Sequence, residues 1–178
     1  TLNSVSHIIA NRMEISYGAV ALAAQGVSGK IGMLFTMLSM GICMGLQPAI
    51  SYNHGKGNHK RTNGIIRNTA IFTFSLGLCL TVICYLNRTL LISMFIKDDQ
   101  VIAYGQTFLL ASIIIGPFYG FYQLCQTYLQ STGKASYASL VALLDKGLFY
   151  LPLLFLLSRL FGLYGIIYTG AVTLFLSL

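Results

Sequence analysis

The sequence predicts an all-α integral membrane protein, a polytopic helix bundle. Of its 178 residues, 56% are hydrophobic and only 8% are charged, whereas soluble domains carry roughly 25% charged residues. Charge-free runs cover 31–55, 68–87, 100–133 and 160–178. Three of them reach the ~20 residues that cross a ~30 Å hydrocarbon layer, and the last is close. The runs lack the alternation of β-barrel strands, and helices satisfy the backbone within each segment, so we expect helical spans.

The N-terminal residues are expected to enter the bundle from a helix that begins upstream. Residues 1–13 are too short and too polar to span a membrane alone. From Ala19 the chain becomes small and apolar, and Lys30 interrupts this run. Lys30 either snorkels at the outer interface or faces a wet cavity. Glycines recur at every third residue here and predict close helix packing: Gly26, Gly29 and Gly32.

The first complete span is predicted over residues 31–52 and the second over 68–87. Pro48 removes a backbone donor, so a kink is expected near the end of the first span. Between the two spans, residues 53–67 are predicted to form a basic loop. Because cytoplasmic loops retain Lys and Arg, this loop is expected on the cytoplasmic side. Its cations are Lys56, Lys60, Arg61 and Arg67, with no acid among them.

The third span is predicted within residues 101–130, after a short loop over 93–100. Asp98 and Asp99 are placed to cap the helix that follows. Gly116-Pro117 lies near the middle of the apolar run and predicts a break. The proline frees the carbonyl of Ile113, which must find another donor inside the membrane.

A polar stripe follows that break. In lipid, such a stripe must face protein or water. It either supplies hydrogen bonds between helices or forms the wall of a substrate cavity, and both interpretations stay open here. The candidate cavity-lining residues are Tyr119, Tyr122, Gln123, Gln126 and Gln130.

The fourth span is predicted over residues 137–157 and contains an adjacent pair of opposite charges, Asp145 and Lys146. A charge at mid-membrane costs ~2.5–3.5 kcal/mol on insertion scales, so each side chain needs a partner or a wet surface. The pair is either a structural anchor or an ion-coupling site in which Asp145 titrates. A loop over 158–165 leads into a fifth span, which is expected to be truncated, as is the N-terminus.

Composition also weighs against several other classes of function. The net charge of +7 is concentrated beside apolar runs, which indicates membrane topology and not nucleic-acid binding. The four cysteines fall inside apolar runs without disulfide or metal spacing, and we expect them to be packing residues. His54 and His59 lack the H-E-x-x-H spacing of a metalloenzyme, so they are interpreted as solvated loop residues. We expect no enzyme activity, no catalytic residue and no metal site or bound cofactor.

Several motifs carry a family resemblance. The pattern G-x-x-x-G-x-Q-P-x-x-x-Y-N-x-G resembles the end of helix eight in multidrug and toxic compound extrusion (MATE) transporters. The segment 130–134 is similar to the end of their helix ten, and 151–153 with 161–165 to helix eleven and the turn into helix twelve. The residues of the first motif are Gly41, Gly45, Gln47, Pro48, Tyr52, Asn53 and Gly55, and Pro117 marks the later helix break.

The resemblance implies that residues 1–178 form the C-terminal lobe of a twelve-helix, two-lobe antiporter, from the end of helix seven to part of helix twelve. Such a transporter lies in the bacterial inner membrane and exports organic cations or drugs in exchange for Na⁺ or H⁺. Its partners would be the lipid bilayer, its substrates and the N-terminal lobe of the same chain.

One departure from the family bears on coupling. Asp145-Lys146-Gly147 stands where relatives often have Arg and Gln, and residues 100–133 contain no acid. The coupling-ion site is therefore expected either at Asp145 or in the missing lobe. The alternatives are a lipid-linked-sugar flippase of related fold and a membrane scaffold without transport activity.

Overall fold

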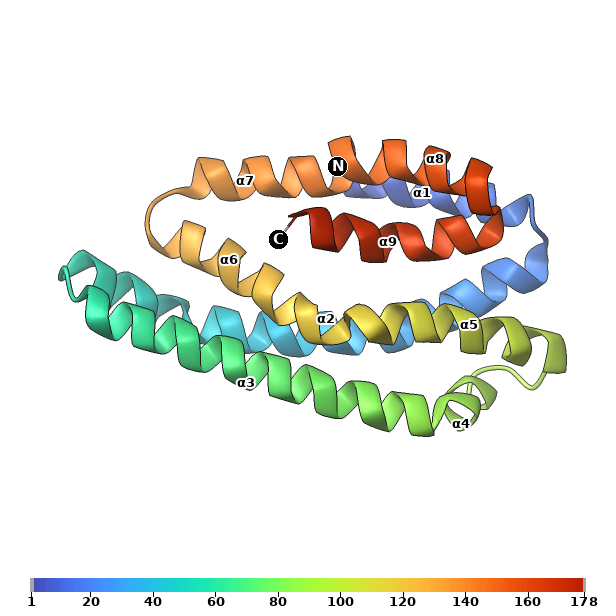
Figure 1. The fold of residues 1–178 in the computed structure, drawn as a ribbon, viewed down its shortest axis with the longest axis horizontal. Coiled ribbons are helices and arrows are strands. Elements are labelled where there is room, and N and C mark those ends of the chain that lie inside the picture. The colour runs from blue at the N-terminus through green and yellow to red at the C-terminus, as the bar shows by residue number, and fades with distance from the viewer. Residues whose placement is uncertain (1, 178) are drawn as a thin grey trace.

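The protein is a bundle of long helices that run side by side along its longest axis (Figure 1). The computed structural model describes the backbone of residues 2–177, and side chains throughout that range except at 2–5, 7, 99 and 146. Every described element of regular structure is helical, as predicted. The elements are α1 (Leu2–Ile15), α2 (Ala19–Gly55), α3 (His59–Leu86), α4 (Arg88–Ser93), α5 (Asp99–Ile115), η1 (Gly116–Phe118), α6 (Tyr119–Ser131), α7 (Ala135–Leu143), η2 (Leu144–Phe149), α8 (Tyr150–Phe161) and α9 (Leu163–Ser177).

Within residues 2–177, four stretches are long and apolar enough to cross a membrane: Ala19–Gly55, His59–Leu86, Gln100–Ser131 and Ala135–Phe161. The helix Leu163–Ser177 is also apolar but shorter. Many large apolar side chains of these helices face outward, as expected where lipid replaces water. Together with α1, this arrangement agrees with the prediction of about five spans and the end of a sixth.

Helix α2 corrects the predicted first span. It runs without interruption from Ala19 to Gly55 and includes Pro48. At about 1.5 Å per residue, its 37 residues extend about 55 Å, beyond the ~30 Å hydrocarbon layer. Pro48 removes one backbone donor, but helical turns continue on both sides of it. The expected kink therefore does not interrupt the helix.

The predicted basic loop over 53–67 is also much shorter than expected. Only residues 56–58 connect α2 to α3, and Gly57 takes a positive φ of 70° in this turn. The side chain of Asn58 accepts a hydrogen bond from the backbone N–H of Arg61 at 3.1 Å and caps α3. Lys60, Arg61 and Arg67 therefore lie on α3, because a good cap lets the helix start before its apolar part.

The turn between α8 and α9 is tighter than the predicted loop over 158–165. Gly162 alone separates the two helices and has a φ of 58°, a conformation that favours glycine. Gly165 lies directly against the backbone of Leu157, and a Cβ at this position would overlap the Leu157 carbonyl. This close approach allows the chain to reverse within one residue.

The break in the third span occurs where the sequence predicts it. A short 3₁₀ turn, η1, separates α5 from α6 at Gly116-Pro117. The carbonyl of Ile113 gains the predicted additional partner, because the Thr81 hydroxyl of α3 donates to it at 2.9 Å. The start of the same span is capped as expected, since Asp98 Oδ1 accepts from the N–H groups of Gln100 at 2.9 Å and Val101 at 3.2 Å.

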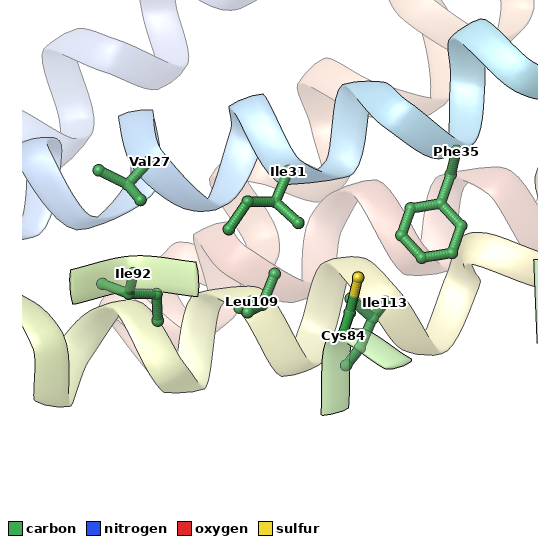
Figure 2. Close-up of a cluster of buried hydrophobic side chains, with 7 residues drawn as sticks. All are labelled: Val27, Ile31, Phe35, Cys84, Ile92, Leu109 and Ile113. Carbon is green, nitrogen blue, oxygen red and sulfur yellow. The ribbon is translucent and has the colours of Figure 1, made fainter. Parts of the chain in front are cut away.

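A buried apolar cluster holds the break in position. Figure 2 shows its side chains meeting between α2, α3, α4 and α5. Gly116 lies against the Phe35 ring, and a Cβ on Gly77 would come within 2.7 Å of Pro117 Cα. The 3₁₀ turn is thus enclosed by two helices. The cluster consists of Val27, Ile31, Phe35, Cys84, Ile92, Leu109 and Ile113.

The cysteines follow the packing prediction only in part. Cys43 and Cys84 are buried, whereas Cys79 and Cys125 are exposed on the surface of the bundle, and all four are free. An apolar run marks a helix in lipid but does not say which of its faces meets protein, and this explains the difference.

Candidate functional site

A cavity of about 440 Å³ lies between helices α2, α5 and α6 on one side and the α8–α9 pair on the other. Helix α2 supplies small and polar residues to it, among them Gln25, Gly29, Gly32 and Thr36. A Cβ added to Gly26 or Gly29 would have no atom within 4 Å, so the close packing predicted for these two glycines is wrong. Gly32 approaches Ser112, with 3.7 Å between its added Cβ and the serine Cβ. Because glycine has no side chain, Gly29 and Gly32 leave open space on this face of α2.

Three residues of the predicted polar stripe line this cavity: Tyr119, Tyr122 and Gln123. They lie in the first two turns of α6, directly after the 3₁₀ turn. Gln126 instead is buried, and its Nε2 donates to Tyr122 Oη at 3.4 Å. Gln130 is exposed near the end of α6. The stripe therefore combines the two functions considered for it, since part of it lines the cavity and part forms hydrogen bonds.

Asp145 lies behind the cavity wall and is 1% exposed. Its Oδ2 accepts from Tyr122 Oη at 3.2 Å, and its Oδ1 accepts from Ser177 Oγ at 3.1 Å. The carboxylate thus connects α6 to α9 and holds one of the cavity tyrosines. The side chain of Lys146 lies outside the described residues.

The backbone around Asp145 has an unusual form. Residues Leu144–Phe149 make a π-helical segment between α7 and α8. Such segments are rare and are frequently found at functional sites. The sequence offered only an indirect signal for it, namely a charged pair followed by Gly147 within an apolar run.

Two further residues of this region were missed as functional candidates. Tyr150 lines the cavity from α8, and an isolated tyrosine in an apolar run gives no signal. Glu14 lies in the last turn of α1 and is 2% exposed. Its Oε2 has no hydrogen-bond partner among the described residues. A single acid among polar residues gives no signal in the sequence that it is buried.

The helix-eight motif mostly shapes the end of α2 and lies away from the cavity. Asn53 is buried, and its Nδ2 donates to the Ala49 carbonyl at 2.7 Å. Gly41 and Gly45 are exposed, with no atom within 4 Å of an added Cβ. Gln47 is partly buried, Pro48 is exposed, and Gly55 is the last residue of α2.

Two further groups singled out in the sequence are Lys30, in the N-terminal half of α2, and the histidines on either side of the α2–α3 turn. Lys30 is exposed, and its Nζ lies 5.6 Å from the centre of the Phe95 ring, which favours the interface interpretation over the cavity one. His54 and His59 are in contact, with ring centres 5.8 Å apart, so they are less freely solvated than expected.

Comparison with known proteins places these features in a family. The family model described as MatE matches residues 1–156. Multidrug export protein MepA of Staphylococcus saprophyticus is 28% identical over 170 residues, which cover 94% of this chain and 37% of that protein. MepA of Staphylococcus aureus strain N315 is 30% identical over 169 residues, which cover 91% of this chain and 36% of that protein. The chain therefore spans little more than a third of the length of these relatives.

Solved structures share the fold. The Vibrio cholerae MATE transporter VcmN in its bent form gives a TM-score of 0.89 at 21% identity, covering 98% of this chain and 40% of that one. A Pyrococcus furiosus transporter of the MOP superfamily, described as having a binding pocket of reverse polarity, gives a TM-score of 0.77 at 17% identity. The match covers 99% of this chain and 39% of that one. Coverage of about 40% is consistent with one lobe of a two-lobe protein.

Proposed function

Because this chain belongs to the MatE family, we propose that it is the C-terminal lobe of a secondary transporter that exports organic cations or drugs in exchange for Na⁺ or H⁺. The relatives named above are described as multidrug export proteins. The observation that carries the proposal is the cavity of about 440 Å³, which has aromatic and amide walls and a buried carboxylate behind them.

The chemistry of the cavity wall favours cations. Tyr119, Tyr122 and Tyr150 provide ring faces that attract positive charge, and Gln123 and Thr36 provide hydrogen bonds that do not require one fixed ligand shape. The Asp145 carboxylate, held by Tyr122, adds negative potential from behind. A cavity of this kind suits amphipathic cations of varied structure.

The second candidate is a lipid-linked-sugar flippase, whose phosphate-bearing substrate would need Lys or Arg in the cavity wall. None of the described residues that line the cavity is basic. Lys30 lies at an exposed position beside Phe95, away from the cavity wall. This distribution of charge favours the exporter, and the presence of a polar cavity disfavours a scaffold.

In the proposed protein, the lobe lies in the bacterial inner membrane with the turn at residues 56–58 on the cytoplasmic side. The N-terminal lobe of the same full-length chain would face it, and the two would rock about the substrate in alternating access. No cofactor is needed beyond the coupling ion.

We assign Asp145 a structural role in this transporter. Its two hydroxyl donors come from different helices, Tyr122 on α6 and Ser177 on α9, so the carboxylate fixes the shape of the cavity wall. Asp145→Asn in the full-length protein should then weaken substrate binding while export stays driven by the same ion. If the Asn variant binds substrate normally but no longer exports against a gradient, Asp145 is the coupling site.

An efflux assay in cells tests the proposal. Full-length protein should lower the accumulation of a fluorescent lipophilic cation, and Gln123→Ala should weaken this effect because Gln123 lines the cavity. Gln130→Ala is the matched control, since Gln130 lies on the same helix but is exposed. Accumulation that is unchanged by expression of the intact protein, or equal effects of the two variants, would contradict the proposed function.

A further inference from the structure

A second carboxyl group, that of Glu14, is buried in the lobe apart from Asp145. Glu14 is 2% exposed, and its Oε2 lacks a hydrogen-bond partner among the described residues. Its neighbourhood is apolar, because the preceding residues Ala10 and Met13 of α1 pack with Leu154 and Ile166. An ionised carboxylate with an unpaired oxygen is costly in such surroundings, and a protonated one is not.

No charged partner compensates Glu14 within the described part of the chain. Helix α1 packs against α2, η2, α8 and α9. Tyr150 of α8 lies within electrostatic range of Glu14, and it is neutral at ordinary pH. The side chains of His7 and Lys146 are outside the described residues. The other titratable groups of these helices are bonded to other residues, exposed or in the C-terminal half of α2. They are Asp145 bonded to Tyr122 and Ser177, Lys30 beside Phe95, the exposed Arg12, Arg159, Tyr164 and Tyr168, and Cys43, Tyr52 and His54 of α2.

Tyr150 connects Glu14 to the cavity. It packs on the cluster formed by Ala10, Leu154 and Ile166, and it also lines the cavity. Glu14 itself does not line the cavity, so a bulky organic cation there would not reach it. A metal cation at Glu14 would lack the several oxygen ligands that hard cations require. A proton needs only the carboxylate oxygen.

We propose that Glu14 is a proton-binding site of this lobe, separated from the cavity by Tyr150. In the described conformation Glu14 carries its proton. When the lobe rearranges and water reaches the carboxyl, the O–H bond breaks, the electron pair stays on the carboxylate and the proton leaves into cavity water. This inference rests on the proposed function, because it assigns the coupling proton of that exporter to a carboxyl group other than Asp145.

Labelling of the full-length protein in membranes tests the proposal without any substitution. Dicyclohexylcarbodiimide reacts with protonated carboxyl groups in apolar surroundings, and mass spectrometry identifies the modified peptide. We expect an adduct on Glu14 at neutral pH that is lost as the pH rises. Glu14 that stays unlabelled at every pH would overturn the proposal, whether or not the protein transports anything.

Proton release gives the second measurement. Purified full-length protein in weak buffer should release protons when it binds a lipophilic cation, and Glu14→Gln should lose this release while still binding the cation. Asp98→Asn is the matched control, because Asn also caps a helix and Asp98 is exposed. Release by Glu14→Gln equal to that of the unmodified protein would overturn the proposal, whereas absence of cation binding in both would contradict the proposed function instead.

Discussion

Replacement of Thr81 by valine probes how the helix break is held. The hydroxyl of Thr81 donates to the Ile113 carbonyl at 2.9 Å and also approaches the carbonyl of Gly77 at 2.9 Å. Valine has nearly the same shape but no donor. Because Ile113 is 1% exposed, water does not replace the lost bond in the folded protein.

The expected cost is modest. A buried polar group left without any partner costs about 1–3 kcal/mol. The Ile113 carbonyl, however, still accepts the N–H of Gly116 at the end of α5. Hydrogen bonds between membrane helices average about 0.6 kcal/mol. We therefore expect Thr81→Val to lower the free energy of unfolding by about 0.6–1 kcal/mol, a roughly three- to five-fold change in the equilibrium constant.

Reversible unfolding of the full-length protein in mixed detergent measures this change. Thr69→Val is the matched control, since Thr69 lies on the same helix, is buried, and donates only to the Ile65 carbonyl of its own helix at 2.7 Å. If the two valine variants unfold identically, the Thr81 bond does not hold the break and the reasoning is wrong.

Three other predictions test the packing, the cavity wall and the topology. Gly165→Ala should destabilise the protein by about 1–3 kcal/mol in the same unfolding measurement, because the added methyl group meets the Leu157 backbone; unchanged stability would contradict the close packing of α8 and α9. In a background without native cysteines, Gln123→Cys should react with a small water-soluble thiol reagent and be protected by a bound lipophilic cation, while Leu124→Cys, at a 4% exposed position, should not; the reverse pattern would mean that α6 is rotated. Asn58→Cys should resist an impermeant reagent added to intact cells and react in inverted membranes, and labelling from outside would overturn the cytoplasmic assignment of the 56–58 turn.

The features that could be predicted from the sequence are those that depend on local chemistry. Gly116-Pro117 breaks the regular helix because proline removes a donor, and the freed Ile113 carbonyl needs a new one, although the identity of Thr81 as that donor required the fold. Asp98 caps α5 for a similarly local reason.

The ends of the long helices were less predictable because hydropathy marks contact with lipid and not the limits of a helix. Lys60 and Arg61 continue α3 beyond its apolar part, once Asn58 caps it. Gly162 reverses the chain within a segment that looked like a longer loop.

The site depends most on tertiary neighbours. The spacing of Tyr119, Tyr122 and Gln123 places them on one face of α6, and this face lines the cavity. Gln126 does not line it and bonds to Tyr122 instead, which depends on how α6 packs. The burial of Glu14 comes from the helices that pack against α1, and the π-helical form of Leu144–Phe149 has no recognised sequence pattern, so neither was visible in the chain alone.

The central claim, that this lobe belongs to an ion-driven exporter of organic cations, is tested most directly in vesicles. Purified full-length protein is reconstituted, and the uptake of a lipophilic cation is followed under an imposed proton or sodium gradient. We expect one of the two gradients to drive accumulation above the external concentration, with collapse when an ionophore dissipates that gradient. Uptake that neither gradient drives would contradict the account.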